Sequence, residues 1–398
     1  MAIDPTYMKG KAAIVGVTDR VSPTGVLGVP ERQLEMEMIG EALEDAGLTI
    51  ADVDGICAAG FMMPSMELAE HLGITPRWTN STMTGGSSFE VHVQQAAAAI
   101  ALGQAEVVVS VYAQTPRARG KGLGDMSAMM GMMDQSNPMP MVEWEMPAGN
   151  VMPGGAYALA ASRHMAKYGT TSEQLAQIAV STREWACKNP RARYQEPITI
   201  DDVLASPMIS TPLRRLDCCL VTDGAGAFVM TSAERAKDLK KKPIYVLGTG
   251  TAHDHAMMIS QMPDLATTPG VISGREAFKQ ADLTPNDVDL LMSYDSFTIT
   301  VALSIEDLGF CPKGEVGAFV EDGKLGPGGS FPVNTSGGGL SYTHPGMYGM
   351  FLIVEAVRQL RGECDDRQLD NPKVAIAHGC GGVLSCTSTA ILGTEDAL

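Results

Sequence analysis

EALEDAGLTIADVD, at residues 41–54, is the stretch that decides the fold, because residues 276–289 repeat it as EAFKQADLTPNDVD. Eight of the fourteen aligned positions are identical (Glu, Ala, Ala, Leu, Thr, Asp, Val and Asp). Each copy lies between two short apolar runs that we expect to be strands, 12–17 and 55–60 around the first and 244–250 and 290–295 around the second. The pattern predicts a strand, a helix that stops at Ala-Gly or Ala-Asp, a polar turn and a second strand, in both halves.

The segments that follow each copy also correspond. In both halves a glycine-rich turn leads into a helix and then into a buried strand. The three segments are 85–86, 87–103 and 106–114 in the first half, and 337–339, 345–362 and 373–379 in the second. Apolar strands that alternate with helices are typical of a sheet covered on both faces. The sequence therefore predicts an α/β fold, a duplicated five-layer αβαβα sandwich with halves 1–240 and 241–398.

Residues 117–210 do not fit the repeat, and we interpret them as an inserted loop domain of the first half. Its segment 125–152 holds nine of the 26 methionines of the chain. Helices are expected at 156–168 and 171–189. Methionine is flexible and apolar, so the segment is either an adaptable wall for a bulky acyl group or the core of a lid.

The composition excludes several classes of protein. The chain has 398 residues and a net charge of −17, which disfavours binding to nucleic acid or to an anionic membrane surface. No run of 18 apolar residues and no leader of the basic–apolar–small type is present, so a cytoplasmic protein is expected. The eight cysteines lack metal-binding spacing and are expected to be reduced and mostly buried, and no metal is expected.

Four further segments carry a resemblance to a known family. They are YALAASRHMAKYGTTSEQLAQIAVSTREWACKNPRARY (157–194), PLRRLDCCLVTDGAGAFVMTSAERA (212–236), GGGLSYTHPGMYG (337–349) and HGCGGVLSCTSTAIL (378–392). Together they resemble the thiolase superfamily, within it the sterol-carrier-protein-2-type thiolases and lipid-transfer proteins, and most closely the steroid side-chain-cleaving CoA aldolases. The resemblance implies the thiolase fold and an active site where four loops converge on a thioester.

The first of these loops departs from the thiolase pattern. The resemblance places the nucleophilic cysteine of thiolases at Gly86, and no cysteine occurs between residues 58 and 186. Ser87 and Ser88 are close, but a serine needs an adjacent base to act as a nucleophile. Both serines are expected to cap the following helix, and all three residues are expected to line the substrate site.

The other three loops supply the remaining candidate residues. The resemblance gives catalytic roles to Tyr294, His344 and Cys380, with a proton donor or acceptor at Tyr294 and a hydrogen-bond donor to a developing enolate at His344. Tyr348 lies four residues after His344, one turn along an expected helix, and is preferred to Tyr342 as a further catalytic residue. The neighbouring residues Asp295, Gly338, Gly339 and Gly381 are expected to contact substrate.

These residues suit retro-aldol cleavage of a β-hydroxyacyl-CoA, because that reaction passes through a thioester enolate without an acyl-enzyme. No cofactor is expected beyond the CoA of the substrate. Weak candidates for binding its phosphates are Arg117, Arg119, Lys121, Arg214 and Arg215. Two alternatives remain: a thiolase or acyltransferase that uses Ser87, Ser88 or Cys380, and a non-catalytic acyl or lipid carrier. The resemblance also implies a homodimer and a small partner protein with an OB fold and a zinc ribbon.

Overall fold

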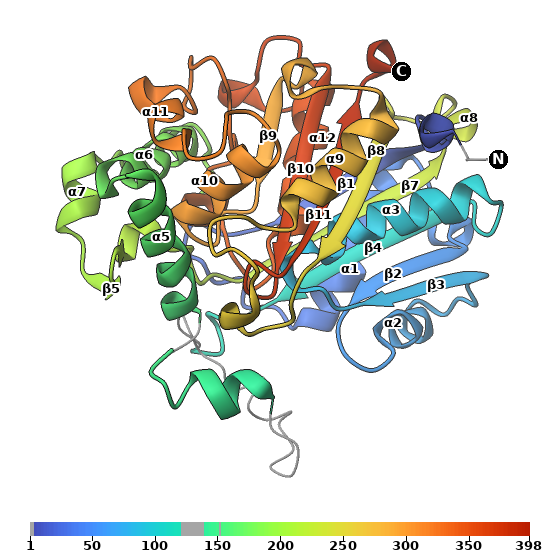
Figure 1. Ribbon diagram of the computed structural model, residues 1–398. Coiled ribbons are helices and arrows are strands. Elements are labelled where there is room, and N and C mark those ends of the chain that lie inside the picture. The colour runs from blue at the N-terminus through green and yellow to red at the C-terminus, as the bar shows by residue number, and fades with distance from the viewer. Residues whose placement is uncertain (1–3, 121–138, 151–152) are drawn as a thin grey trace.

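The two copies of the repeat adopt the same local structure in the computed structural model, which describes residues 4–120, 139–150 and 153–398 (Figure 1). The helices α1 (Glu31–Ala46) and α9 (Gly270–Ala281) end at the repeated alanine. The next residue is left-handed in both, with φ of 75° at Gly47 and 52° at Asp282. A short 3₁₀ turn follows in each copy. The predicted helix stop is confirmed at both sites.

The last aspartate of each repeat explains why that residue recurs. The Asp54 carboxylate accepts hydrogen bonds from two amides where β4 (Val107–Gln114) begins, and Asp289 does so where β10 (Val374–Gly381) begins. The distances are 2.8 and 2.9 Å from the amides of Glu106 and Val107, and 2.7 and 2.9 Å from those of Lys373 and Val374. Each aspartate therefore fixes the start of a buried strand in its half.

A nine-stranded sheet runs through the molecule in the order β3-β2-β4-β7-β1-β8-β11-β10-β9. Its other strands are β1 (Ala12–Arg20), β2 (Gly55–Ala59), β3 (Trp78–Thr82), β7 (Gly224–Ser232), β8 (Ile244–His253), β9 (Leu290–Ser293) and β11 (Cys386–Gly393). Counted outward from the junction of β1 and β8, the strands β1-β7-β4-β2 of the first half correspond to β8-β11-β10-β9 of the second. Where a counterpart of β3 would lie beside β9, the structure has an isolated bridge between Leu291 and Val333.

Helices cover both faces of each half of the sheet. The helices α3 (Ser88–Ala101) and α12 (Gly349–Arg361) contact each other and strands of both halves, so they form a central layer. The helix α1 packs on β1, β7 and β4, and α9 packs on β8 and β11 (Figure 1). The helices and strands therefore form the five layers that were predicted.

The inserted segment leaves the first half but packs on the second. It contains α5 (Gly154–Tyr168), α6 (Ser172–Cys187), α7 (Ile200–Ala205), and a small sheet of β5 (Met208–Ser210) and β6 (Leu213–Arg214). The helices α5 and α6 pack against α10 (Thr298–Asp307) (Figure 1). Most of the methionine-rich segment, 125–138 and 151–152, lies outside the described residues, so its two interpretations stay open.

The remaining elements are short. They are α2 (Pro64–Leu72), α8 (Ala233–Ala236), α11 (Val316–Phe319), π turns at Met141–Glu145 and Gly338–Tyr342, and 3₁₀ turns at Pro5–Met8, Ile50–Asp52, Gly85–Ser87, Arg215–Asp217, Ile259–Gln261, Pro285–Asp287, Glu321–Gly323, Asp365–Arg367 and Glu395–Ala397. Over the three described stretches, no helix is long and apolar enough to cross a membrane. All eight cysteines are free, and six of them are buried, as predicted.

Candidate active site

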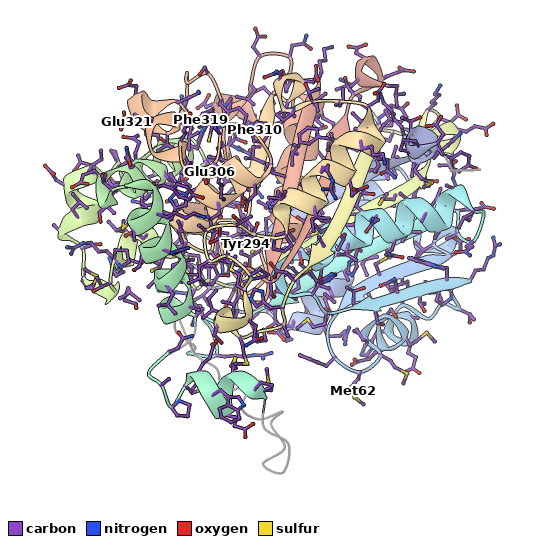
Figure 2. All side chains as sticks on the ribbon, in the orientation of Figure 1. Met62, Tyr294, Glu306, Phe310, Phe319 and Glu321 are labelled. Atoms are coloured by element: carbon purple, nitrogen blue, oxygen red, sulfur yellow. The ribbon has the colours of Figure 1, made fainter. Side chains whose placement is uncertain are left out.

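Four loops meet where β9 and β10 end, as the sequence predicts. They are residues 84–88, 294–297, 337–348 and 380–385. A Cβ atom on Gly85 would lie 2.7 Å from the amide nitrogen of Gly382, which places the first loop directly on the fourth. Tyr294 joins the second loop to the third through hydrogen bonds described below. Tyr294 is buried, and Figure 2 labels its position near the middle of the view.

A side chain at position 86 and the ring of Tyr294 would occupy the same space. A Cβ atom on Gly86 would lie 2.1 Å from Cε2 of Tyr294 and 2.5 Å from the carbonyl oxygen of Cys380. Side chains do not approach that closely without displacing a neighbour. The tyrosine ring therefore fills the space that a cysteine side chain at position 86 would need, and the site has no nucleophile at this point.

The hydroxyl of Tyr294 is the centre of the hydrogen bonding. It lies 3.0 Å from Nε2 of His344 and 3.4 Å from the carbonyl oxygen of Gly346, and it accepts a hydrogen bond of 3.2 Å from the amide of Tyr348. Burial raises the pKa of Tyr294 well above its usual range, and nearby Cys219 adds to the effect. The phenol is therefore protonated at neutral pH and is a proton donor in the resting site.

His344 faces Tyr294 as a neutral imidazole. Its amide donates a hydrogen bond of 2.8 Å to the hydroxyl of Thr222. Burial lowers the pKa of His344 to about 4, because the protonated ring would lose its hydration. In the tautomer with Nε2 unprotonated, the imidazole can accept the hydrogen bond of the Tyr294 phenol. The pair can therefore pass a proton from the tyrosine to the histidine.

The prediction for Tyr348 needs a correction of geometry. The helix expected from residue 345 begins at Gly349, so His344 is not at a helix start and both residues precede α12. The hydroxyl of Tyr348 lies 3.0 Å from that of Ser336, and it is the amide of Tyr348 that reaches Tyr294. Tyr342, the less favoured alternative, donates its hydroxyl to Asp19.

Cys380 lies on β10 beside the first loop and is almost fully buried. Burial raises the pKa of its thiol to about 12, with a smaller contribution from Cys386, while the amide of Leu384 partly opposes the shift. A thiol with this pKa is protonated at neutral pH. Cys380 is thus suited to donate a proton, and it is poorly suited to attack a thioester.

Two neighbours of Tyr294 were missed from the sequence. Tyr157 of α5 stacks on Phe297, with ring centroids 4.4 Å apart, and Cys219 donates its amide to the carbonyl oxygen of Ser296 at 2.9 Å. Both side chains raise the pKa of Tyr294. Tyr157 belongs to the insertion, and its pattern there is that of an ordinary helix residue, so nothing in the sequence linked it to the site.

The two serines after Gly86 do not cap α3 as expected. Ser87 donates its hydroxyl to the carbonyl oxygen of Thr84 at 3.0 Å, and Ser88 donates to that of Gly85 at 2.7 Å. No side-chain capping bond is formed at the start of α3. The hydroxyls therefore bond back to the backbone of the preceding turn, as serine side chains at helix starts can do. No base contacts either serine among the hydrogen bonds of the described residues.

The remaining residues that were predicted to contact substrate are close to the site, but most of them are hydrogen-bonded or closely packed within the protein. The Asp295 carboxylate accepts hydrogen bonds from the amides of Gly339 at 2.6 Å and Leu340 at 3.1 Å. Burial raises the pKa of Asp295 to about 7. A Cβ atom on Gly338 would lie 2.0 Å from this carboxylate, and one on Gly381 would lie 1.6 Å from the carbonyl oxygen of Thr84. These residues shape the loops, and their contact with substrate stays a prediction.

The basic residues that are candidates for CoA binding differ in their contacts and exposure. Arg117 extends to the carbonyl oxygen of Val221 at 3.4 Å, one residue before the Thr222 that holds His344. Arg119 is paired with Glu31 at 2.5 Å, and Arg214 donates to the carbonyl oxygen of Ser206 at 3.1 Å. Arg215 is exposed, and Lys121 lies outside the described residues. Of the five, Arg117 is thus linked to the segment that holds His344.

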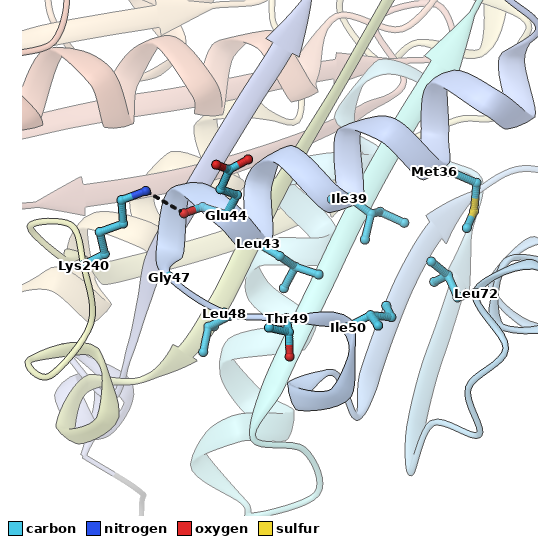
Figure 3. Close-up of a pocket in the computed structure, with 11 residues that line it drawn as sticks. Met36, Ile39, Leu43, Glu44, Gly47, Leu48, Thr49, Ile50, Leu72 and Lys240 are labelled. Atoms are coloured by element: carbon cyan, nitrogen blue, oxygen red, sulfur yellow. Dashed lines mark hydrogen bonds between the residues drawn. The ribbon is translucent and has the colours of Figure 1, made fainter.

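A surface cavity lies apart from the four loops. Its volume is about 540 Å³, and it opens beside α1 in the first half (Figure 3). Its lining is mostly apolar and includes Ile39, Leu43, Ile50 and Leu72, with Lys240 at one end. None of its lining residues belongs to the four loops. Within the described residues, no group of three or more histidine, cysteine, aspartate or glutamate side chains could hold a metal ion.

The comparisons with known proteins agree with this geometry. Residues 250–394 match the family described as "Thiolase C-terminal domain-like". The chain is 37% identical to the 17-hydroxy-3-oxo-4-pregnene-20-carboxyl-CoA lyase of Mycobacterium tuberculosis, over 97% of this chain and all of that one. It is 35% identical to an acetyl-CoA acetyltransferase of Methanothermobacter thermautotrophicus, over 86% of this chain and 88% of the other. A solved structure named "Ltp2-ChsH2(DUF35) aldolase" superposes with a TM-score of 0.87 at 34% identity, over 98% of this chain and 99% of the other.

Proposed function

The chain belongs to the thiolase superfamily, and from that membership we propose that it cleaves a β-hydroxyacyl-CoA by a retro-aldol reaction. The observation that carries the proposal is the mutual exclusion of Gly86 and Tyr294. The tyrosine ring fills the nucleophile's place, and its hydroxyl lies 3.0 Å from a neutral histidine. An acyl-enzyme has no attachment point there, whereas proton transfer has a complete pair. The related M. tuberculosis lyase and the Ltp2-ChsH2 aldolase support the same reaction class.

The proposed steps begin at the β-hydroxyl of the substrate. Its proton moves to the oxygen of Tyr294 while the phenol proton moves to Nε2 of His344. The Cα–Cβ bond then breaks, so that a ketone or aldehyde forms at Cβ and the electron pair passes to the thioester as an enolate. The amide of Tyr348 stays on the Tyr294 oxygen and positions it throughout.

The enolate carbon must then receive a proton. Cys380 holds a proton at neutral pH, because burial raises its pKa to about 12, and we assign it this donation. The proton stored on His344 then restores the thiol, so no net proton is lost. The products are a ketone or aldehyde and a shortened acyl-CoA.

The first test is cleavage of a tertiary β-hydroxyacyl-CoA without free CoA. Wild-type protein should release the ketone, and Tyr294→Phe and His344→Ala should each lower kcat by ~10²–10⁴-fold, the range for removing a general acid or base. Tyr245→Phe is the matched control, since Tyr245 is a buried tyrosine of β8 away from the four loops and its loss should leave kcat near wild type. Each protein is assayed with and without a candidate small partner.

Two results would contradict the proposal. One is ketone release that is unchanged in Tyr294→Phe. The other is no release without CoA, combined with CoA-dependent cleavage of a β-ketoacyl-CoA. The second result would favour acyl transfer, the alternative to which the 35% identical acetyltransferase points. The serine hydroxyls bonded to backbone carbonyls and the protonated Cys380 weigh against it.

We further propose that the chain forms a homodimer through β3. This strand is at one end of the sheet order and has no charged residue or proline to protect its free edge. Exposed apolar side chains adjoin it, namely Phe61, Met62, Met63, Met66 and Met83. Figure 2 shows Met62 at the surface. We call these five residues the Met62 patch.

A small DUF35-type partner is also proposed, because the related Ltp2 structure is named as a complex with ChsH2 (DUF35). The OB fold and zinc ribbon of such a partner, and a cytoplasmic location, stay predictions. A partner would supply further basic groups for the CoA phosphates.

A further inference from the structure

Glu90 is a buried acid behind the active site for which the proposed reaction has no use. It lies in the first turn of α3, four residues after Gly86, and its side chain is fully buried. Neither carboxyl oxygen has a hydrogen-bond partner in the described part of the chain. An isolated ionised carboxylate at such a depth is very unfavourable, so a charged Glu90 would need compensation that its surroundings do not supply.

The carboxyl fits into a space made by two glycines on other elements. A Cβ atom on Gly349, the first residue of α12, would lie 2.5 Å from Oε2 of Glu90 and 2.3 Å from the carbonyl oxygen of Gly86. A Cβ atom on Gly379, next to Cys380 on β10, would lie 2.2 Å from the same Oε2. Glu90 thus contacts the elements that carry Gly86, Tyr348 and Cys380.

From this packing we propose that Glu90 is a positioning residue that works as a neutral carboxylic acid. It fills the space between Gly86, Gly349 and Gly379 and so keeps the Tyr348 amide on the Tyr294 hydroxyl, and its ionisation disrupts that arrangement. A charged carboxylate would draw in water or push α12 away from the first loop. The proton of Glu90 would therefore be required for activity.

The groups around Glu90 give it no counter-charge. The thiols of Cys380 on β10 and Cys386 on β11 lie near it, since Glu90 helps to raise the pKa of both, and the acidic Asp254 after β8 acts on the same two thiols. Burial raises the pKa of Cys380 to about 12, and it also raises that of Cys386. Burial raises the pKa of Glu90 to about 8. Glu90 is therefore the first of the buried members of this group to change charge as the pH rises above neutral.

The test is the pH profile of kcat in the full-length protein, and this arm rests on the proposed lyase function. Wild-type kcat should fall ~tenfold per pH unit above about 8, as expected for loss of one required proton. Glu90→Gln keeps the shape and cannot ionise, so its alkaline limit should move up by at least ~1 pH unit. Glu35→Gln is the control, because burial also raises the pKa of Glu35, to about 7, at a site outside the four loops. Its alkaline limit should match wild type.

A second measurement separates failure of this inference from failure of the proposed function. The folded-state pKa of Glu90 is raised from 4.5 to about 8, so stability falls as the pH rises through this window and is then constant. The melting temperature of Glu90→Gln minus that of wild type should therefore increase between about pH 4.5 and 8, whatever reaction the protein catalyses. Glu90→Met should show the same gain if the variant with glutamine folds poorly. An unchanged alkaline limit in Glu90→Gln, loss of its activity at every pH, or parallel melting curves would each overturn the proposal.

Discussion

Gly86 and Tyr294 determine each other at the scale of single residues. A nucleophile at position 86 and a tyrosine at position 294 cannot coexist, since the Cβ of the first would lie 2.1 Å from the ring of the second. Conversion to a thiolase would therefore need both positions to change. The loss of acyl-enzyme chemistry and the gain of the tyrosine–histidine pair are one structural event.

Gly86→Cys should consequently inactivate the protein without creating a thiolase. We expect the new side chain to displace Tyr294 and to lower stability by about 1–3 kcal/mol through overpacking, with CoA-independent cleavage lost. The measurements are chemical denaturation and the ketone-release assay. Adding Tyr294→Asn should restore part of the stability, because a Cβ atom at position 86 would still lie 2.5 Å from the carbonyl oxygen of Cys380, and it should not restore the cleavage.

Gly40→Ala provides the control for this variant. Gly40 lies on the exposed side of α1, and a Cβ atom there would meet nothing within 4 Å. This substitution should raise stability by ~0.5–1 kcal/mol and leave activity unchanged. If Gly86→Cys is as stable and active as Gly40→Ala, the steric exclusion described above is wrong.

The sequence predicted the candidate residues that belong to motifs and missed those that do not. Gly86, Tyr294, His344 and Cys380 each follow a recognisable turn or strand, and the structure brings them together. Glu90 was not predicted, because an acid in the first turn of a helix usually faces solvent and interacts with the helix dipole. Its position is an interior one because α3 lies in the central layer, and the two glycines opposite Glu90, far away in the sequence, leave room for its side chain.

At the scale of elements, one buried charge joins three parts of the chain. Asp19 of β1 contacts Arg191 of the insertion at 2.7 Å and Arg358 of α12 at 2.5 Å, and it also accepts the hydroxyl of Tyr342. Burial alone would raise the pKa of Asp19, but the two guanidinium groups hold it well below its usual range. This cluster attaches the insertion to both halves.

Asp19→Asn should lower stability at neutral pH by about 2–4 kcal/mol. Breaking a buried pair costs ~3–5 kcal/mol, and the value is reduced here because the side chain of Arg191 is 36% exposed. The pKa of Asp19 is depressed in the folded state, so its stabilisation exists above the unfolded value of about 4 and is lost as the pH falls toward the folded value. Denaturation at about pH 7 and about pH 3 should show the difference between variant and wild type shrinking.

Asp396→Asn is the control for this pair of measurements. Asp396 also contacts a basic residue, Lys373, but its side chain is 67% exposed, and surface pairs contribute little. It should behave as wild type at both pH values. A difference for Asp19→Asn that does not depend on pH would contradict the assignment of the effect to its charge.

The repeat made the elements predictable, and the contacts explain why. Residues that are identical in the two copies, such as Asp54 and Asp289, make the same hydrogen bonds at the start of a strand. The start of α12 was predicted four residues too early. Its polypeptide reads as a helix from Pro345, but the Tyr112 hydroxyl donates to the carbonyl of Pro345 and accepts from the amide of Met347, which keeps this segment extended as a loop.

For the whole molecule, the dimer proposal makes a clear prediction. Light scattering should give the mass of two chains for the wild-type protein. Substituting two members of the Met62 patch, Met62→Glu with Met63→Glu, should give one chain, because charges on an apolar interface are costly to bury. Leu102→Glu is the control, since Leu102 is 69% exposed at the end of α3 and outside the patch. A monomeric wild type, or a dimeric double variant, would disprove the interface.

The five layers followed from the sequence because strands and helices alternate in two matching sets. The packing of the insertion against α10 could not be predicted from the sequence, because nothing in the sequence of its helices indicates which element they contact. The sequence attached this segment to the first half, which is correct for the chain connection. Its buried bond between His164 and Glu306, at 3.0 Å, shows that it also packs on the second half.

The single bridge at Val333 limits how many copies can join. A duplicated sheet would have two similar edges, and pairing at both would add molecules without end and produce filaments. In this chain β3 is a full strand, whereas its counterpart is reduced to one bridge that directly follows Pro332. Proline cannot donate to a neighbouring strand. The two ends of the sheet are therefore unequal, and the proposed assembly through β3 would close after two subunits.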